Sequence, residues 1–197
     1  MSGAERPVLS ERVGRAIVIT FNRPEARSPL SIEVLAAISE ILQRAKVDDS
    51  VLGTVFTGVD GVFASGADLR EIAAVTARSA SGFARRGQTL MSSIANYPKP
   101  TVAAVNGYCF GGALDLALCC TRRIASLRAE FSHPGATLGI MTGWGGTQRL
   151  PRLVGEASAM EMFLTAKRVS AAEALRMGLI DGIVDDPLAA AIAEIDF

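Results

Sequence analysis

Two glycine-rich turns, each placed directly before a predicted helix, are the first residues whose pattern suggests chemistry. They are Ser65-Gly66-Ala67-Asp68 and Phe110-Gly111-Gly112-Ala113. Backbone N–H groups at a helix start lack partners within the helix and lie at the positive end of its dipole, so they can hold a developing oxyanion. Glycine lets a substrate approach the backbone closely. The turns also suit phosphate binding or a tight corner, although neither matches GxGxxG or GxxxxGK[ST].

Asp115 and His133 are the side chains near these turns that could move a proton. Asp115 follows Gly112 by three residues on the same predicted helix, so its carboxyl can reach back toward the turn. It is either a general acid/base or a first-turn acid that stabilises the helix dipole by about 0.3–1 kcal/mol. His133 stands two residues before Gly135, and in an extended segment both would face one side. Its imidazole then either transfers protons or is structural.

Alternating strands and helices must position these residues. Strands are predicted at 15–21, 51–57, 101–105, 123–126 and 130–132, with loops or turns at 58–66 and 106–112. Helices are predicted to begin at 32 and 69 and to cover 113–120, 143–153, 157–166 and 171–177, with a loosely amphipathic region up to 97. Ser31 is the expected N-cap of the first helix, and Asp68 with Glu71 has the form of a capping box. This order predicts an α/β architecture with a largely parallel sheet.

Composition limits the class of protein. The 197 residues suit one domain over 1–197, and 20 Lys plus Arg balance 20 Asp plus Glu, so we expect neither nucleic acid nor a membrane as a partner. Cys109, Cys119 and Cys120 lack metal-type spacing and are interpreted as reduced thiols in the core, with no metal site expected. No stretch resembles a signal peptide or a spanning helix, which predicts a cytoplasmic protein.

Five blocks of the chain resemble the crotonase (enoyl-CoA hydratase/isomerase) family in order and spacing. Three are Val62-Phe-Ala-Ser-Gly-Ala-Asp-Leu69, the segment from Lys99 to Asp115, and Gly143-Trp-Gly-Gly-Thr-Gln-Arg-Leu-Pro-Arg152. Residues 22–30 and 171–180 supply the other two. The resemblance implies a crotonase-type spiral of ββα turns with largely parallel sheets. It also implies an acyl-CoA or enoyl-CoA substrate and a place in fatty acid metabolism. Because coenzyme A is part of that substrate, the resemblance implies no separate cofactor.

The resemblance also assigns roles to individual residues. It implies an oxyanion hole made by the N–H groups of Ala67 and Gly112, and backbone contacts from Ser65 and Ala67 to the adenine of coenzyme A. Arg27 is implied near the pantetheine or phosphate end. The remaining residues expected to bind substrate are Gly66, Asp68, Gly111, Gly135 and Trp144. Trp144 either lines the acyl pocket or packs in the core. The same two alternatives hold for Phe83, Leu90 and Met91, because apolar residues at helical spacing are typical of a core.

The proton-transfer pair departs from the family pattern. Family hydratases resemble one another in using two glutamates; the first falls on Asp115 and the second on Gly135. We therefore expect a lyase or isomerase whose only well-placed carboxylate is Asp115. The alternative is a non-catalytic or impaired acyl-CoA-binding homologue. His133 could replace the missing glutamate, or a bound bicarbonate could, as in the naphthoyl-CoA synthases of the family.

The C-terminal region is also predicted from the resemblance. Family members continue into further helices, of which residues 187–197 look like the cut-short start, so the C-terminal helical region is expected to be truncated. The family resemblance further implies a homo-oligomer, either a trimer or a hexamer.

Overall fold

The computed structural model describes residues 6–196, in which strands and helices alternate. The strands are β1 (Val8–Val13), β2 (Ala16–Phe21), β3 (Gly53–Gly58), β4 (Val62–Ala64), β5 (Thr101–Val105), β6 (Tyr108–Phe110), β7 (Arg122–Ala125), β8 (Glu130–Ser132), β9 (Val169–Ser170) and β10 (Gly182–Ile183). The α-helices are α1 (Ile32–Val47), α2 (Leu69–Ala73), α3 (Ala80–Ala95), α4 (Gly112–Ala117), α5 (Gly146–Val154), α6 (Glu156–Thr165), α7 (Ala171–Arg176) and α8 (Pro187–Asp196). Two short 3₁₀ helices are η1 (Pro24–Ala26) and η2 (Pro134–Leu138).

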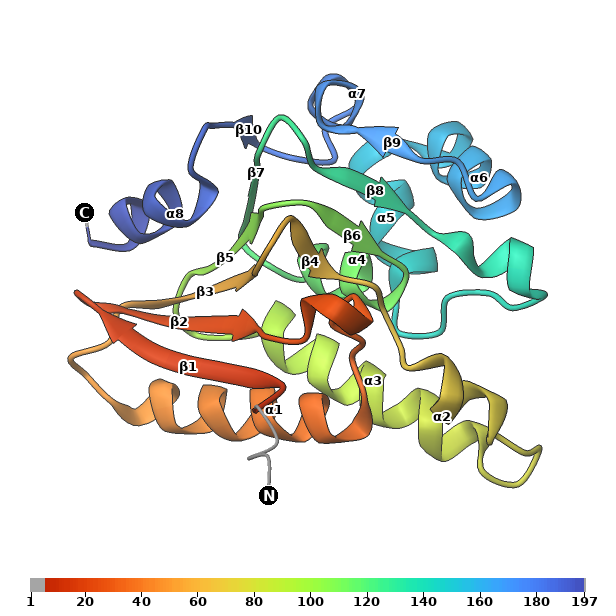
Figure 1. The fold of residues 1–197 in the computed structure, drawn as a ribbon, viewed down its shortest axis with the longest axis horizontal. Helices are drawn as coiled ribbons and strands as arrows, with labels where there is room; N and C mark the ends of the chain where they lie inside the picture. Colours follow the sequence, from red (N-terminus) through yellow and green to blue (C-terminus); the bar gives the residue numbers. More distant parts are fainter. Residues whose placement is uncertain (1–5, 197) are drawn as a thin grey trace.

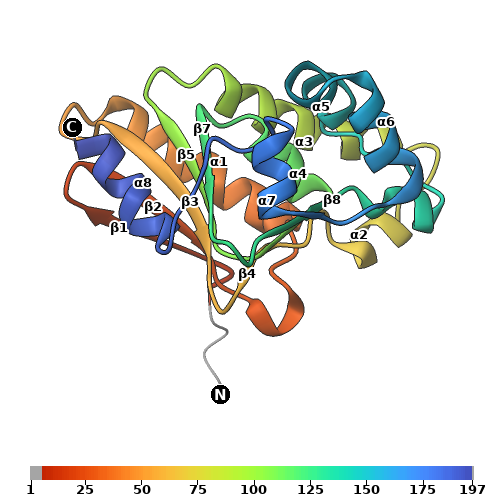
Figure 2. The same ribbon diagram turned by 90° about the horizontal axis from the view of Figure 1, so that it is seen from above.

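Two sheets receive strands alternately as the chain proceeds. The larger has the order β1-β2-β3-β5-β7-β10 and the smaller the order β4-β6-β8-β9. Their pairs are parallel except β1 with β2 and β8 with β9. Thus β3 and β4, β5 and β6, and β7 and β8 each place one strand in each sheet before a helix follows (Figures 1 and 2). The predicted α/β class and the spiral of ββα turns are confirmed.

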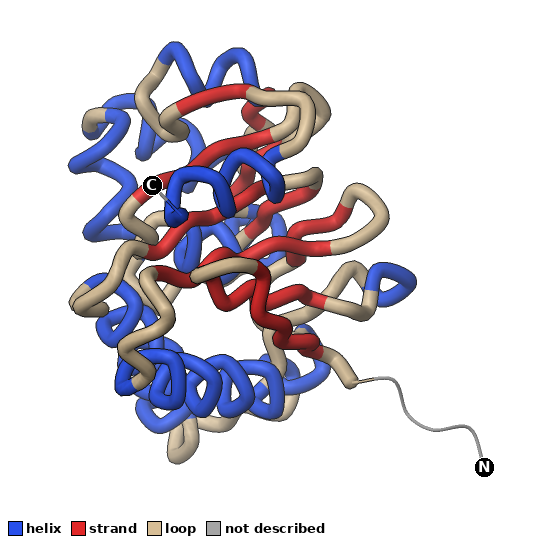
Figure 3. Tube along the Cα trace, turned by 90° about the vertical axis from the view of Figure 1, so that its left-hand side faces the viewer, coloured by secondary structure: helices blue, strands red, loops and turns tan. Residues whose placement is uncertain are grey.

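The larger sheet is buried on both faces. On one face the main core includes Phe21, Ile38 and Phe56, and on the other Val55 and neighbouring strand residues pack against Ile195 of α8. Figure 3 shows this C-terminal helix lying across the strands. Parallel strands covered on both faces are continuous apolar runs rather than alternating ones, which is why β5 has five buried residues in succession.

The predicted helix N-caps Ser31 and Asp68 are confirmed, whereas the predicted capping role of Glu71 is wrong. Ser31 is the N-cap of α1, where its hydroxyl accepts from the Val34 N–H at 3.3 Å. Asp68 is the N-cap of α2 and accepts from the Arg70 N–H at 2.8 Å. Glu71 does not complete a capping box at Asp68. Instead, both of its carboxylate oxygens lie 3.0 Å from the Ile32 N–H, so Glu71 joins α2 to the start of α1.

Several predicted boundaries were wrong because short strands carry little periodicity. The predicted loop at 58–66 contains β4 and the predicted turn at 106–112 contains β6, which pair with each other in the smaller sheet. Glycine at 107 permits this contact, since a Cβ there would lie 1.7 Å from the Gly61 carbonyl oxygen. Strand β1 was not predicted from its mixed charges. Helix α5 begins at Gly146, three residues later than expected.

The three cysteines are free and buried, as predicted for small core residues. Within residues 6–196, no helix combines the length and the apolar character that crossing a membrane would require. The predicted start of a C-terminal helical region corresponds to α8, while Phe197 lies outside the described residues. Residues 1–5 of the segment interpreted as lacking a signal peptide lie outside them as well.

Candidate active site

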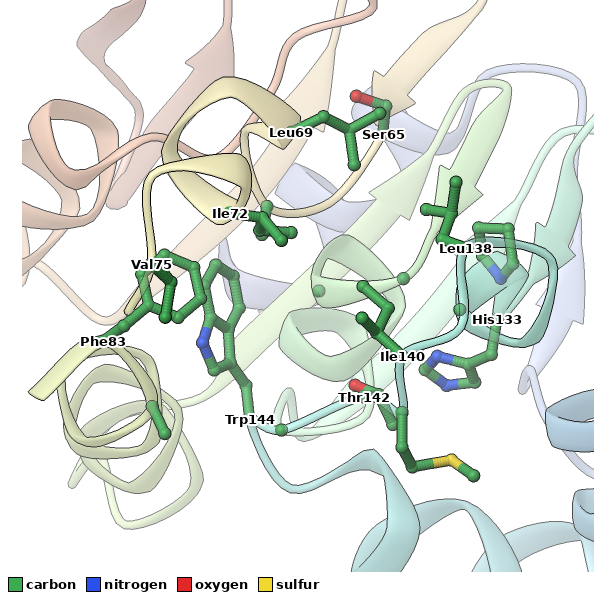
Figure 4. Close-up of a pocket in the computed structure, with 18 of the residues that line it drawn as sticks. Ser65, Leu69, Ile72, Val75, Phe83, His133, Leu138, Ile140, Thr142 and Trp144 are labelled. Carbon is green, nitrogen blue, oxygen red and sulfur yellow. The ribbon is translucent and has the colours of Figure 1, made fainter. Parts of the chain in front are cut away.

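A largely apolar cavity of about 410 Å³ lies where the two glycine-rich turns meet α3 and the loop before α5. Figure 4 shows Phe83 and Trp144 side by side at one end, with His133 and Leu138 at the other. The cavity is lined by Ser65, Ala67, Leu69, Ile72, Val75, Ala80, Phe83, Ala84, Gly111, Gly112, His133, Pro134, Gly135, Leu138, Ile140, Met141, Thr142, Gly143 and Trp144. Within residues 6–196, no three His, Cys, Asp or Glu side chains gather as metal ligands.

The two turns touch through their glycines. Gly66 has φ +92°, and a Cβ on it would lie 2.8 Å from both the Gly112 nitrogen and the Phe110 carbonyl oxygen. Glycine is therefore required for this close approach. Each turn is also held to a neighbouring segment, because the Leu30 N–H donates to the Gly66 carbonyl at 2.7 Å and the Gly111 N–H donates to the Ser132 carbonyl at 2.9 Å.

The N–H groups of Ala67 and Gly112 are available at this junction. Neither donates to a backbone carbonyl in the part of the chain that the structure describes. They are also neighbours, since a Cβ built on Gly112 would lie 3.4 Å from the Ala67 nitrogen. Both residues line the cavity. Two unpaired backbone donors thus lie together on the wall of an apolar pocket.

Asp115 is buried directly behind that wall. Its side chain has 0% exposure and does not line the cavity, whereas Thr142, which does, donates its hydroxyl to the Asp115 Oδ2. Burial raises the pKa of Asp115 to about 6, against the lowering effects of the Thr142 hydroxyl, the Trp144 N–H and the positive charge of Arg149. The carboxyl can therefore hold or release a proton close to neutral pH.

His133 lies between Asp115 and the cavity, but not in the extended segment that we predicted. It precedes η2 directly, and its Nε2 is 3.7 Å from the Asp115 Oδ1. Its ring packs on Phe163 with centroids 5.0 Å apart. Burial lowers the pKa of His133 to about 4, so the imidazole is neutral at pH 7.

Gly135 lines the cavity near His133 and leaves no room for a side chain. A Cβ at this position would lie 2.5 Å from the Ile140 carbonyl oxygen, because η2 and the following residues fold back over it. The Ile140 N–H donates to the Gly135 carbonyl at 3.0 Å and fixes this return. A carboxylate at residue 135 would therefore require the loop at 135–140 to move.

Trp144 both packs and lines the cavity. It is 4% exposed, and its indole packs against two glycines. A Cβ on Gly87 of α3 would lie 2.2 Å from the indole, and a Cβ on Gly112 of α4 would lie 2.5 Å from it. Its ring centroid is 6.1 Å from that of Phe83. The carbonyl of the preceding Gly143 accepts from the Gln88 side chain at 2.8 Å, which ties the loop to α3. Leu90 and Met91, in contrast, belong to the core and do not line the cavity.

Two predicted binding residues lie apart from this cavity. The Asp68 carboxylate pairs with Arg70 at 2.8 Å in a separate surface hollow. Arg27 is exposed at the end of η1, with φ +59°. The structure brings Ser65, Ala67, Gly111, Gly112, Gly135 and Trp144 together around the cavity, while Gly66 is buried against Gly112 and does not line it. Sequence analysis missed Thr142, because a single threonine in a loop gives no signal of a contact with Asp115.

Comparison with known proteins places the chain in a family. A family model described as enoyl-CoA hydratase/isomerase matches residues 11–191. The chain is 37% identical over 179 residues to a short-chain-enoyl-CoA hydratase of Clostridium acetobutylicum, covering 90% of this chain and 69% of that protein. It is 38% identical over 178 residues to a crotonyl-CoA hydratase of Syntrophomonas wolfei, covering 90% and 68%.

The fold agrees with these sequence matches. The solved structure of an enoyl-CoA hydratase from Bacillus anthracis superimposes with a TM-score of 0.91 at 31% identity, covering 97% of this chain and 76% of that one. The chain therefore belongs to the enoyl-CoA hydratase/isomerase family, also called the crotonase family. The resemblance seen in the five sequence blocks is confirmed.

Proposed function

We propose that the chain binds an enoyl-CoA thioester in the 410 Å³ cavity and holds the charge of its carbonyl oxygen on the N–H groups of Ala67 and Gly112. The observation that carries this proposal is the pair of neighbouring backbone donors, unpaired among the described residues, on an apolar wall. Such donors need no reorganisation as charge develops, and losing one typically costs about 100- to 1,000-fold in rate. The named activities of the relatives support an enoyl-CoA as the substrate class.

Asp115 supplies the proton-holding group in this proposal. Its pKa of about 6 lets the carboxyl change protonation near neutral pH, as hydration or double-bond isomerisation requires. Both reactions pass through the same enolate, which the two amides would stabilise. The chain is accordingly proposed as a lyase or isomerase of the family.

A second candidate is an acyl-CoA-binding protein without turnover. The steric closure around Gly135 favours it, because the position of the second family glutamate has neither a carboxylate nor room for one. In that case the amide pair binds the thioester carbonyl, and Asp115 has only a structural role.

Crotonyl-CoA hydration, followed at the absorbance of the conjugated thioester, separates the two candidates. We expect Asp115→Asn to lower kcat by about 100- to 10,000-fold and Asp115→Glu to retain part of the activity. Asp185→Asn is the matched control, since Asp185 is exposed and remote from the cavity. Wild-type turnover that Asp115→Asn leaves unchanged would reject the assigned role of Asp115, and binding of crotonyl-CoA without turnover would favour the second candidate.

We also propose that the chain forms a homo-oligomer through the surface of α5 and α6. Leu153, Met160 and Leu164 on these neighbouring helices are exposed by 37%, 56% and 62%, and contact with another chain would cover them. Light scattering should report a mass of several chains, and Leu164→Glu should lower it. A monomer at micromolar concentration would contradict this proposal.

A further inference from the structure

We propose that His133 is the catalytic residue that exchanges protons with the substrate. In this proposal Asp115, held by Thr142, is the buried carboxylate that orients the imidazole and stabilises its protonated form. This inference rests on the proposed function and deepens it, because it names the group that touches the reacting atoms. It also offers a reason why a carboxylate at residue 135 is not needed.

The first argument is the order of the side chains from the cavity inward. His133 and Thr142 line the cavity, while Asp115 lies behind them with 0% exposure. Both lining side chains lie against the carboxylate, so either can pass a proton between Asp115 and a bound thioester. The Thr142 hydroxyl already donates its proton to the Asp115 Oδ2. His133 is the better suited of the two, because its imidazole can accept and donate protons on two different nitrogens, whereas a hydroxyl is too weak a base to hold a proton.

The second argument is that the facing atoms of the pair are buried and unpaired. Asp115 Oδ1 and both ring nitrogens of His133 have no hydrogen-bond partner among the described residues. Nε2 and Oδ1 are 3.7 Å apart, which is longer than a hydrogen bond of about 2.7–3.2 Å. Closing that gap would pair Nε2 with the carboxylate and leave Nδ1, which is also buried, as the nitrogen that can exchange a proton. Buried polar atoms without partners are rare in structural roles and are expected where a ligand completes them.

The third argument is the space reserved around the pair. A Cβ on Gly146, the first residue of α5, would lie 2.1 Å from the Asp115 Oδ1 and 3.1 Å from the His133 Cε1. Any larger residue at position 146 would press on the carboxylate from the side that faces the imidazole. The start of α5 is thus shaped to leave Asp115 and His133 facing each other.

The surrounding charges make this pair a base at neutral pH. Asp115, with a pKa of about 6, is mainly ionised at pH 7, while the pKa of about 4 keeps His133 neutral. Arg149 on α5 adds a positive charge that favours the carboxylate. Burial raises the pKa of Cys119 to about 12 and that of Cys109 well above its usual value, so both thiols stay protonated. Within this cluster, protonation near neutral pH is thus confined to the pair.

One group can then carry out both proton transfers of hydration. His133 accepts a proton from water as the water oxygen bonds to Cβ, and the electrons of the Cα–Cβ double bond move onto the thioester oxygen. The Ala67 and Gly112 amides hold the enolate, and the Asp115 carboxylate stabilises the imidazolium. The imidazolium next gives the same proton to Cα as the carbonyl re-forms. The net change is the addition of one water molecule, with His133 neutral again.

The test compares His133→Gln with Asp115→Asn, using butyryl-CoA for binding and crotonyl-CoA for turnover. Gln keeps the polarity and approximate size of histidine but cannot take up a proton in this range. We expect His133→Gln to lower kcat by about 100-fold or more. We expect its dissociation constant for butyryl-CoA, measured by calorimetry, to stay within about twofold of the wild-type value. Circular dichroism at the assay temperature verifies that each variant is folded.

Two further readouts distinguish a catalytic role from a structural one. Wild-type kcat should fall as the pH decreases through about 6, where the pair takes up a proton, and in Asp115→Asn this limb should move toward pH 4. Exchange of the α-hydrogens of butyryl-CoA with deuterium oxide, followed by NMR, should occur in the wild type and be lost in His133→Gln. Exchange reports enolate formation without requiring net hydration.

Each outcome either supports or overturns the inference. If His133→Gln keeps kcat within about threefold while Asp115→Asn loses it, Asp115 acts directly and the inference fails, while the proposed function stands. If the wild type binds butyryl-CoA but catalyses neither hydration nor exchange, the relay is wrong and only thioester binding remains. If no coenzyme A thioester binds, the proposed function fails with it.

Discussion

The two sides of the cavity are built in different ways. The amide side, made of Ala67 and Gly112, consists of backbone groups placed by glycines that touch at van der Waals limits. The proton side consists of the side chains of Asp115 on α4, His133 between β8 and η2, and Thr142 in the loop before α5. Backbone donors depend on steric fit and tolerate no added atom, whereas side-chain groups can be replaced singly. Substitutions should therefore disrupt the amide side as a unit and the proton side one residue at a time.

The largest effect is expected from Gly66→Ala. Its added methyl would meet the Gly112 nitrogen and the Phe110 carbonyl at 2.8 Å and would force the two turns apart. Because separation misplaces both amides, we expect kcat for crotonyl-CoA to fall by about 1,000-fold. Steady-state kinetics measures this loss.

Gly155→Ala is the control for Gly66→Ala. Gly155 has φ +79°, close to the +92° of Gly66, but a Cβ there would meet nothing within 4 Å. Each variant should lose about 1–3 kcal/mol of stability from backbone strain, and Gly66→Ala should lose more because of its steric contacts; only Gly66→Ala should lose activity. Equal activity in the two variants would show that the contact between the turns does not matter for catalysis.

The next prediction concerns how the free energy of unfolding depends on pH, which should have opposite signs for Asp115 and His133. The pKa of Asp115 is raised from 3.8 to about 6, so its contribution to stability is present below pH 3.8 and is lost as the pH rises through 6. The pKa of His133 is lowered from 6.5 to about 4, so its contribution is present above pH 6.5 and is lost as the pH falls through 4. In the wild type the two opposite changes in the free energy of unfolding cancel between about pH 4 and 6.

Substituting one residue of the pair should reveal the pH dependence of stability that the other residue contributes. In Asp115→Asn the free energy of unfolding should increase by about 3 kcal/mol from pH 4 to 6.5, and in His133→Gln it should decrease by about 3 kcal/mol from pH 4 to 6. Urea denaturation at a series of pH values measures both. The same pH dependence in the two variants would refute the buried, oppositely shifted pair.

The smallest effect on activity is expected from Gly135→Glu, which would restore a carboxylate to the second family position. Since a Cβ at 135 would lie 2.5 Å from the Ile140 carbonyl oxygen, the new side chain must displace the loop and cannot simply add a second acid. We expect no gain in crotonyl-CoA hydration and a lower melting temperature. A gain of tenfold or more would show that the proton side is incomplete rather than rebuilt.

Local signals predicted most of the fold and the amide side. The helix after Ser31 and the strand at 101–105 follow from periodicity and capping, and the glycine turns follow from composition. Contacts between distant residues were not predictable in the same way. Glu71 reaches Ile32 instead of its own helix start, and Thr142 meets Asp115 across 27 residues. The three-residue strands β4 and β6 likewise depend on pairing with distant segments, β4 with β6 and β6 also with β8.

The central claim is that the amides of residues 67 and 112 receive one thioester oxygen. A crystal structure with bound acetoacetyl-CoA tests it most directly. We predict that the thioester oxygen lies about 2.7–3.1 Å from both the Ala67 and the Gly112 nitrogens. A thioester bound in the cavity with its oxygen beyond hydrogen-bond distance of either nitrogen would contradict the claim.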